Sequence, residues 1–324
     1  MDNLTHSLVG ALLGQMGLKK KTGLAIPTLV LAANLPDIDA ACLFWLDGMQ
    51  HLGFRRGITH GPIAMLVLPI ILWALMIAFD RWQERRSKRP VDRLPVHRGW
   101  FLALVYIGCL SHPALDWLNN YGIRLLEPFS SSWFYGDSIF IIDLWVWIAL
   151  AVSLWLSLRR ERRGAANWQR PAWIGFAAVS AYIFANGLIT GAAERMASDA
   201  LAAGGQKDAL VVASPPPLAF WRRDIFWRTA DRYGTANFTP GVGGQVDLTG
   251  APTGMGDPRL AMWIKGDPNA RAFLFWARMP VAERDGDAIL LRDQRFMHPL
   301  AEERFQVRLT APDTASAPNS AARM

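Results

Sequence analysis

The sequence predicts a mainly α-helical fold, a polytopic membrane bundle followed by a small, mainly antiparallel β domain on its outer face. Composition is the first observation behind this prediction, because 52% of the 324 residues are hydrophobic and only 19% are charged. The second is the distribution of the apolar residues, which form long stretches before residue 193 and short runs after it. Long apolar stretches are typical of membrane-crossing helices, and short runs between turns are typical of strands.

Four stretches are close to the roughly 20 apolar residues that cross the hydrocarbon core of a bilayer. The stretches 62–79 and 171–193 contain no charge. The stretches 99–118 and 139–158 contain a single acid each, Asp116 and Asp143 respectively. Two shorter segments, at about 4–18 and 23–35, predict short tilted helices or a helical hairpin packed against the spans. The start of the sequence lacks the basic region of a secretory signal peptide.

The basic residues orient this bundle. The net charge is +7, and 15 of the 34 Lys and Arg residues lie in segments 19–21, 80–98 and 159–170, together with only four acids. Cytoplasmic loops of membrane proteins are enriched in Lys and Arg, so these segments are expected inside. The positive charge therefore reports orientation, and we expect no nucleic-acid partner. The only cysteines, Cys42 and Cys109, lie in apolar stretches and exclude a disulfide scaffold.

The chain after the last span differs in character. Turn-formers separate short runs rich in aliphatic and aromatic residues, which predict strands: 218–227, 272–277 and 288–291. We expect a helical membrane domain (1–193), a linker (194–213), a small β domain (214–311) and a disordered tail (312–324), because the tail has little to bury. The predicted topology places everything after residue 193 on the outer, periplasm-like face.

Six ionisable residues from separate parts of the sequence fall at the outer ends of the predicted helices: His6, Asp37, Asp39, His60, His112 and Asp116. Ionisable groups at membrane depth are costly and indicate function. His112 and Asp116 are four residues apart, so a helix places them on one face. Mixed imidazole and carboxylate groups suit Zn²⁺, Mn²⁺ or Fe²⁺ better than calcium. The pattern predicts a site for one or two divalent ions, most simply zinc.

Each of these residues also has a non-functional explanation. His6 could be an interfacial polar residue, Asp37 and Asp39 a solvated turn or helix cap, and His112 with Asp116 a hydrogen-bonded patch. Asp143 could orient a ligand histidine or be an interfacial acid. Arg55 and Arg56 could bind a phosphate or lipid headgroups, and His51 could be a ligand or a loop residue. His97 and His298 fall outside the predicted site.

Four motifs carry a resemblance to a known family: Met1–Ser7, Leu35–Asp39, Arg56–His60 and His112–Asp116. The segments 120–122 and 126–129 also fit the pattern of that family. Through about residue 150 the chain resembles the bacterial LexA-binding, inner-membrane-associated hydrolases, also described as membrane-bound metal-dependent hydrolases. That family is distantly similar to zinc-dependent phospholipases C and fungal single-strand nucleases, which bind zinc through His and Asp. A second His-x-x-x-Asp pair is not visible here, and Arg55 stands where the family often has His.

The resemblance implies a bacterial inner-membrane, multi-pass enzyme with a zinc or manganese centre. The resemblance implies His112, Asp116, His60 and an aspartate from Asp37 or Asp39 as metal ligands. From the resemblance together with the residue pattern, we expect the metal ligands to be His6, Asp37, His60, His112 and Asp116, and the catalytic residues to be Asp39 and Arg56. A site at the bilayer edge favours a lipid or lipid-linked phosphoester substrate, so membrane lipids are the expected partners. The alternatives are an intramembrane His/Asp pathway for ions or protons and a non-catalytic membrane scaffold. Nothing in the sequence itself supports binding to the LexA repressor.

Overall fold

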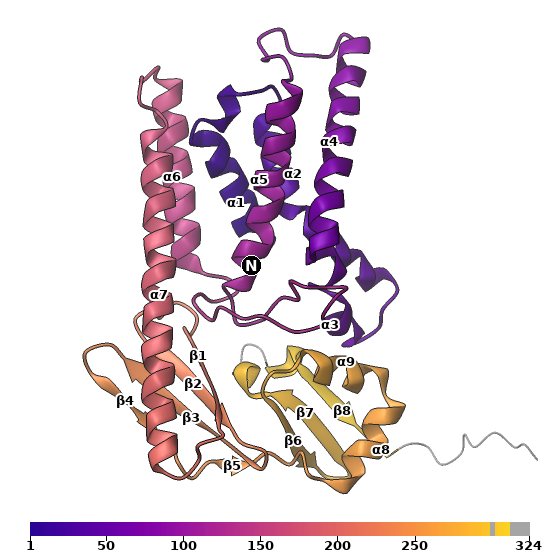
Figure 1. Ribbon diagram of the computed structural model, residues 1–324, viewed down its shortest axis with the longest axis vertical. Helices are drawn as coiled ribbons and strands as arrows, with labels where there is room; N and C mark the ends of the chain where they lie inside the picture. Colours follow the sequence, from indigo (N-terminus) through magenta and orange to yellow (C-terminus); the bar gives the residue numbers. More distant parts are fainter. Residues whose placement is uncertain (299–301, 312–324) are drawn as a thin grey trace, which may run out of the picture.

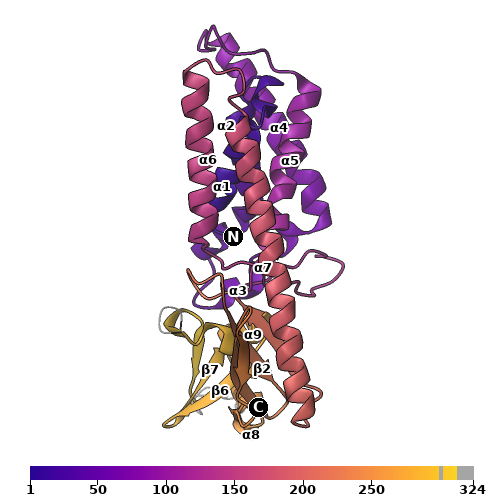
Figure 2. The same cartoon turned by 90° about the vertical axis from the view of Figure 1, so that its left-hand side faces the viewer.

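Six long helices lie side by side along the long axis of the molecule, as the computed structural model shows for the described residues, 1–298 and 302–311 (Figure 1). Five of them are confined to the upper part of the view, whereas the sixth continues downward past the sheets (Figures 1 and 2). The six are α1 (Asn3–Gln15), α2 (Ala25–Asn34), α4 (Pro62–Arg85), α5 (Arg98–Trp117), α6 (Leu144–Arg162) and α7 (Arg170–Ala203).

Three segments of this region are long and apolar enough to cross a membrane by length and composition: Ala25–Phe44, Pro62–Arg85 and Arg170–Ala203. Two of them contain the predicted spans 62–79 and 171–193. The other two predicted spans, 99–118 and 139–158, coincide with α5 and with most of α6. Helix α6 begins only at Leu144, because the Asp143 carboxylate accepts the backbone N–H groups of Trp145 and Val146 and so caps the helix at that point.

Glycines let helices α1 and α5 each approach α2 closely. A Cβ atom on Gly10 would lie 2.8 Å from the carbonyl oxygen of Leu29, and one on Gly108 would lie 2.7 Å from the Cβ of Ala32. Small residues permit this kind of backbone contact between membrane helices. His6 lies four residues before Gly10, and His112 lies four residues after Gly108, so each shares a helix face with its glycine. The close packing therefore brings the two imidazoles together.

The chain between α2 and α4 is compact and irregular. A 3₁₀ helix, Leu35–Phe44, follows α2 directly, and it is followed by the short helix α3 (Gln50–Phe54) and a 3₁₀ turn, Ile58–His60. Helix α3 packs against α9 (Pro268–Trp276) of the C-terminal region, where Leu52 joins a cluster of buried residues that includes Phe273 and Trp276. The site region and the C-terminal region thus share a hydrophobic core.

The C-terminal region contains two antiparallel sheets. In the first, the order is β1-β2-β3-β4, with β5 also paired to β3; in the second, it is β6-β7-β8. The strands are β1 (Leu210–Ser214), β2 (Arg223–Arg228), β3 (Arg232–Thr239), β4 (Gly243–Val246), β5 (Ala251–Pro252), β6 (Pro280–Asp285), β7 (Ala288–Asp293) and β8 (Gln306–Leu309), with helix α8 (Pro258–Gly266) preceding α9 and 3₁₀ turns at Gln294–Phe296 and Glu302–Arg304.

The structure corrects one expectation here. The run 272–277, predicted as a strand, lies within α9 except for its last residue, because the Asp267 carboxylate caps the helix and Pro268 occupies its first turn. The predicted linker 194–213 contains the end of α7 and most of β1. The predicted disordered tail, 312–324, lies outside the described residues.

A buried arginine fixes the long helix to the first sheet. Arg223 on β2 is fully buried and donates to the backbone and side-chain oxygens of Asn186 (2.8 and 2.7 Å) and to the hydroxyl of Thr190 (2.9 Å) on α7. Burial lowers the pKa of this guanidinium to about 10, which still leaves it charged at neutral pH. The contacts explain why α7 continues past the other helices alongside the sheet.

A second buried arginine organises the other sheet. The fully buried Asp293 carboxylate accepts the Arg295 side chain at 2.8 and 2.9 Å and the Arg278 backbone N–H at 2.8 Å. Burial by itself would raise the pKa of Asp293, but the Arg295 charge and the hydrogen bonds hold it below the ordinary value of 3.8. Because the folded-state pKa is depressed, this stabilisation is complete at neutral pH and is lost as the pH falls through the folded-state value.

We predict that Asp293→Asn lowers the free energy of unfolding of the C-terminal region by about 3–5 kcal/mol, because it leaves the Arg295 charge buried without a counter-ion. Thermal unfolding and protease susceptibility in detergent measure this effect. The matched control is Asp285→Asn, which removes the partner of Arg308 in a pair whose side chains are 54% and 57% exposed. That change should cost no more than about 1 kcal/mol. Equal losses in the two variants would contradict the prediction.

Candidate metal centre

The predicted site residues meet at the end of the helical bundle that faces the sheets. The N-terminus marks this end in Figure 1, and the basic turns that connect α4 to α5 and α6 to α7 lie at the opposite end. Three parts of the chain converge here: the start of α1, the segment 35–60 and the last turns of α5. The basic turns and the site residues thus lie at opposite ends of the bundle.

Four of the five predicted ligands form one group. Asp37, His60, His112 and Asp116 each offer a ligand atom, and these atoms all lie within 4.8 Å of one another. Zinc takes nitrogen and oxygen ligands at about 2.0–2.2 Å in a tetrahedral arrangement, so ligand atoms around one ion are about 3.3–3.6 Å apart. The side chains are therefore close to the spacing that a single ion requires.

The hydrogen bonds of the two imidazoles assign their tautomers. His112 Nδ1 donates to the carbonyl oxygen of Ala33 at 2.7 Å. His60 Nδ1 lies 3.0 Å from the hydroxyl of Thr59, which also lies 3.1 Å from the Asp39 carboxylate; when the Thr59 proton is donated to Asp39, Nδ1 of His60 donates to Thr59. Both Nε2 atoms then carry lone pairs, because a neutral imidazole has one donor and one acceptor.

These two Nε2 atoms lie only 3.1 Å apart, and both rings are buried. Two lone pairs facing each other repel, and a cation placed against both of them would convert the repulsion into attraction. Burial, with His112 adding a smaller effect, lowers the pKa of His60 well below its ordinary value. His60 is thus a neutral imidazole, the form that binds metals. The donor set fits a divalent cation.

Asp116 is the common partner of the group. Its side chain is fully buried, and Oδ2 lies 3.5 Å from His112 Nε2, 3.7 Å from His60 Nε2 and 3.1 Å from Arg56 Nε. Oδ1 accepts from the amino group of Met1. A buried carboxylate is stable only with such compensation. The carboxylate holds together residues of α5, of the segment 55–60 and of the start of the chain.

Arg56 has an unusual backbone conformation that serves this site. Its φ angle is +55°, in the left-handed region that non-glycine residues seldom adopt. The Asp39 carboxylate accepts the Arg56 N–H at 2.7 Å, and Arg124 N–H donates to the Arg56 carbonyl at 2.9 Å. Strained backbone of this kind occurs at functional sites, where the surroundings hold it in place. The turn directs the buried guanidinium toward Asp116.

His6 and Asp39 lie beside the four-ligand group rather than in it. The His6 ring stacks on His112 with centroids 3.8 Å apart, and its Nε2 lies 3.3 Å from Asp116 Oδ1. Within the described chain neither ring nitrogen of His6 has a hydrogen-bond partner. Asp39 lies behind His60, with Oδ2 3.6 Å from Nδ1. Asp39 therefore orients His60 through Thr59, as outer carboxylates orient metal-bound histidines.

The predicted catalytic residue Arg56 is engaged with the protein itself. Its guanidinium donates to Asn119 Oδ1 and to the Gly122 carbonyl, each at 3.2 Å, and stacks over Tyr121 at 4.5 Å. Arg55 is more accessible, with 27% of its side chain exposed, and it lies 3.1 Å from Asp37 and 3.5 Å from Asp39. Among the described residues of the site, Arg55 is thus the better placed arginine to meet a substrate.

The structure also tests the non-functional explanations of the candidate site residues. Asp37 and Asp39 lie in the 3₁₀ helix and are largely buried, so they are not a solvated turn. Asp143 caps α6 and accepts from the Tyr182 hydroxyl at 3.0 Å, so it does not orient a ligand histidine. His51 contacts the carbonyl of Gly48 in the loop and lies outside the group.

Sequence reasoning did not identify three residues that complete the site: Thr59, Asn119 and Tyr121. Thr59 connects Asp39 to His60, Asn119 accepts from Arg56, and Tyr121 packs against the Arg56 guanidinium. Thr59 and Tyr121 do fall within segments that carry the family resemblance, which was the available signal. Their roles depend on contacts between distant segments and have no local pattern.

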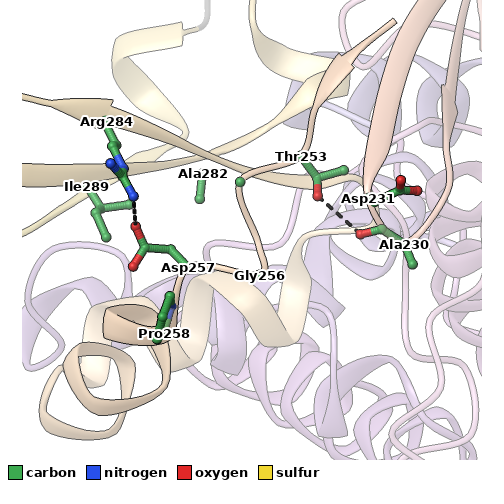
Figure 3. Close-up of a pocket in the computed structure, with 10 residues that line it drawn as sticks. Ala230, Asp231, Thr253, Gly256, Asp257, Pro258, Ala282, Arg284 and Ile289 are labelled. Carbon is green, nitrogen blue, oxygen red and sulfur yellow. Dashed lines mark hydrogen bonds and ion pairs between the residues drawn. The ribbon is translucent and has the colours of Figure 1, made fainter.

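A separate cavity of about 490 Å³ lies within the C-terminal region (Figure 3). Its charged residues include Asp257, which caps α8 and pairs with Arg259 at 2.8 Å and with Arg284 at 3.1 Å. The carboxylate is thus already satisfied by neighbouring side chains. This cavity resembles a structural crevice more than a reactive centre.

Comparison with known proteins agrees with the helical region. A family model described as YdjM inner membrane protein matches residues 1–193, which include all seven predicted site residues and more than half of the chain. No curated protein and no solved structure matches the chain. The match supports the inner-membrane part of the resemblance; it does not address metal binding, hydrolysis or LexA.

We predict that the purified wild-type chain binds zinc stoichiometrically and that His112→Ala does not, because the substitution removes a central ligand and the imidazole that faces His60. Elemental analysis after dialysis against zinc measures the bound metal. His51→Ala is the matched control, since it removes a histidine outside the group, and it should retain the wild-type zinc content. Equal zinc in the wild type and in His112→Ala would argue against this ligand set.

A second substitution tests the positioning role of Asp39. Asp39→Asn should weaken zinc binding by about 10–100-fold without abolishing it, which is the usual effect of removing an outer partner of a ligand histidine. Competition with a chromogenic chelator measures the affinity. If Asp39 were itself a ligand, zinc would be lost as completely as in His112→Ala.

Proposed function

The chain belongs to the YdjM inner membrane protein family, and from this premise we propose that it is a membrane-bound, metal-dependent hydrolase of phosphoester bonds. The proposed substrate is a lipid or lipid-linked phosphoester. The proposed location is the bacterial inner membrane, crossed several times, with the C-terminal region on the periplasmic face. The proposed cofactor is one divalent ion, zinc in the first instance and manganese as the alternative.

One observation carries this proposal: two buried imidazole Nε2 atoms face each other at 3.1 Å beside the buried Asp116 carboxylate. Asp116 Oδ2 beside them is buried without a hydrogen-bond partner among the described residues, whereas buried polar atoms almost always have one. His60, His112 and Asp116 converge with Asp37 at the end of a helical bundle and could hold a metal ion; these are the ligand types of hydrolytic zinc centres, which supports the proposal.

When bound, a divalent ion supplies Lewis acidity, which activates water and draws electrons from a phosphoryl oxygen. The residues around it have separate tasks. His60 and His112 are held in their ligand tautomers by Thr59 and by the Ala33 carbonyl. Arg55, partly exposed beside Asp37, is placed to bind the anionic phosphoester, because a guanidinium can contact two phosphate oxygens at once. Asp39 remains the candidate general base, although its contacts favour positioning.

The alternatives predict different behaviour. A pathway for ions or protons would place ionisable groups along the depth of the bundle, whereas the buried His and Asp residues described above gather at one end. A scaffold would need neither the paired imidazoles nor the strained turn at Arg56. Hydrolysis accounts for both features.

We predict that the full chain, in detergent with zinc, releases phosphate or a phosphorylated headgroup from a phospholipid or a polyprenyl phosphate. Asp116→Ala should reduce this release to the background rate, because it removes a ligand and the counter-charge of Arg56. A chelator should abolish the wild-type activity, and added zinc or manganese should restore it. His51→Ala is the control that should keep full activity. Full activity in metal-free wild-type protein would refute the mechanism.

A further prediction concerns the number of ions. The Arg55 guanidinium lies between Asp37 and Asp39, so one fixed cation already neutralises carboxylates that a second ion would use. We therefore expect one bound zinc in the wild type and a second in Arg55→His, which exchanges the fixed charge for a ligand. Elemental analysis and titration measure the stoichiometry. Two ions in the wild type would contradict this assignment.

A further inference from the structure

A large apolar cavity separates the end of the helical bundle from the two sheets. Its volume is about 870 Å³, within the usual range of roughly 300–1,000 Å³ for ligand sites. Its walls come from the segment 140–147 at the start of α6, the chain from 214 to 226, residues 233–236 of β3, the segments 294–298 and 304–305 after β7, and Asn120. Each wall belongs to a different part of the fold.

The rim of the cavity is apolar and exposed. Ile142, Leu144 and Leu218 line it with exposed fractions of 51%, 38% and 58%. Trp145, next to this rim, donates from its indole N–H to the Leu218 carbonyl at 2.8 Å. The rim thus lies at the end of an apolar helix, where tryptophan and aliphatic side chains typically meet the headgroup region of a bilayer.

The interior is not uniformly apolar. Three buried residues that line it carry side-chain oxygen atoms without a hydrogen-bond partner among the described residues: Asn120 Oδ1, Ser214 Oγ and Gln294 Oε1. These side chains are 3–4% exposed. Buried polar atoms normally find a partner, and two of the three are amide oxygens, which accept hydrogen bonds only. A ligand that carries hydroxyl groups supplies the missing donors.

A positive charge accompanies these oxygens. Arg304 lines the same cavity and is exposed, so its guanidinium is available to a phosphate. Hydrocarbon, hydroxyl groups and an anionic phosphate occur together in a phospholipid whose headgroup is a polyol. The apolar wall of the cavity therefore suits the acyl chain of such a lipid, and the side-chain oxygens and Arg304 suit its headgroup.

We propose that this cavity binds a polyol-headed anionic phospholipid, such as phosphatidylglycerol, with an acyl chain along the apolar wall. The inference rests on the membrane location and not on hydrolysis. One contact and one chain neighbour connect the cavity to the metal centre. Trp147 donates to the Thr5 hydroxyl at 2.9 Å beside His6, and Asn120 follows in sequence Asn119, which accepts from Arg56. A lipid bound here lies against the walls that support the cluster.

The test uses the full chain in nanodiscs that contain phosphatidylglycerol with a photoreactive diazirine on one acyl chain. Irradiation followed by peptide mass spectrometry should place label on 140–147 and 214–226. Thr235→Trp should reduce this label by about tenfold, equivalent to ~1.4 kcal/mol in affinity. Thr235 is exposed, lines the cavity and lies opposite Phe226 on the neighbouring strand, so an indole there fills the space.

Asn237→Trp is the matched control, because Asn237 is an exposed residue on the same face of β3 but does not line the cavity. The Asn237→Trp variant should be labelled as strongly as the wild type, and thermal unfolding should confirm that both variants fold. Phosphatidylcholine with the same photoreactive chain should label these peptides less, since its headgroup has no hydrogen-bond donor. Equal labelling by the two lipids, or equal labelling of both variants, would overturn the proposal. Chelated protein is used throughout, so the result does not depend on phosphoesterase activity.

Discussion

The carboxylate of Asp116 is the constraint on which the site depends. It is fully buried near the end of α5, and such a charge is tolerated only when cations and polar groups surround it. The groups that do so come from sequence positions far apart: Arg56 and His60 before α4, His6 in α1 and His112 one turn earlier on α5. Satisfying one buried charge therefore fixes the relative positions of three segments.

Close helix packing makes that arrangement possible. Gly10 and Gly108 allow α1 and α5 to contact α2 through their backbones, and their helix faces continue to His6 and His112. The strained turn at Arg56 forms the third side of the site, and hydrogen bonds with Asp39 and Arg124 hold this turn in place. Packing and polar contacts thus support each other, since neither the glycines nor the turn would bring the imidazoles together alone.

The C-terminal region is joined to this site and not merely appended to it. The indole N–H of Trp276 donates to the Tyr121 carbonyl at 3.2 Å, and the Arg295 guanidinium donates to the carbonyl of Asn120. Tyr121 in turn packs against Arg56. The chain from Asn119 to Tyr121 is therefore in contact with the metal cluster on one side and the sheets on the other. A change in the sheets can reach the cluster through this short segment.

The sequence by itself determined the helical character of the first 193 residues, the antiparallel strands after them, and the candidate ligands, because hydrophobic period and charge distribution are local properties. It also predicted the i, i+4 pairing of His112 and Asp116, which contact at 3.5 Å. The tertiary structure decided which candidates form one group: Asp37, His60, His112 and Asp116 converge, whereas His6 and Asp39 stand beside them and Asp143 caps a helix. It also decided that 272–276 belongs to a helix and that Thr59 and Tyr121 complete the site. The physical reason is that these outcomes depend on contacts between segments distant in sequence, and neither spacing nor composition encodes such contacts.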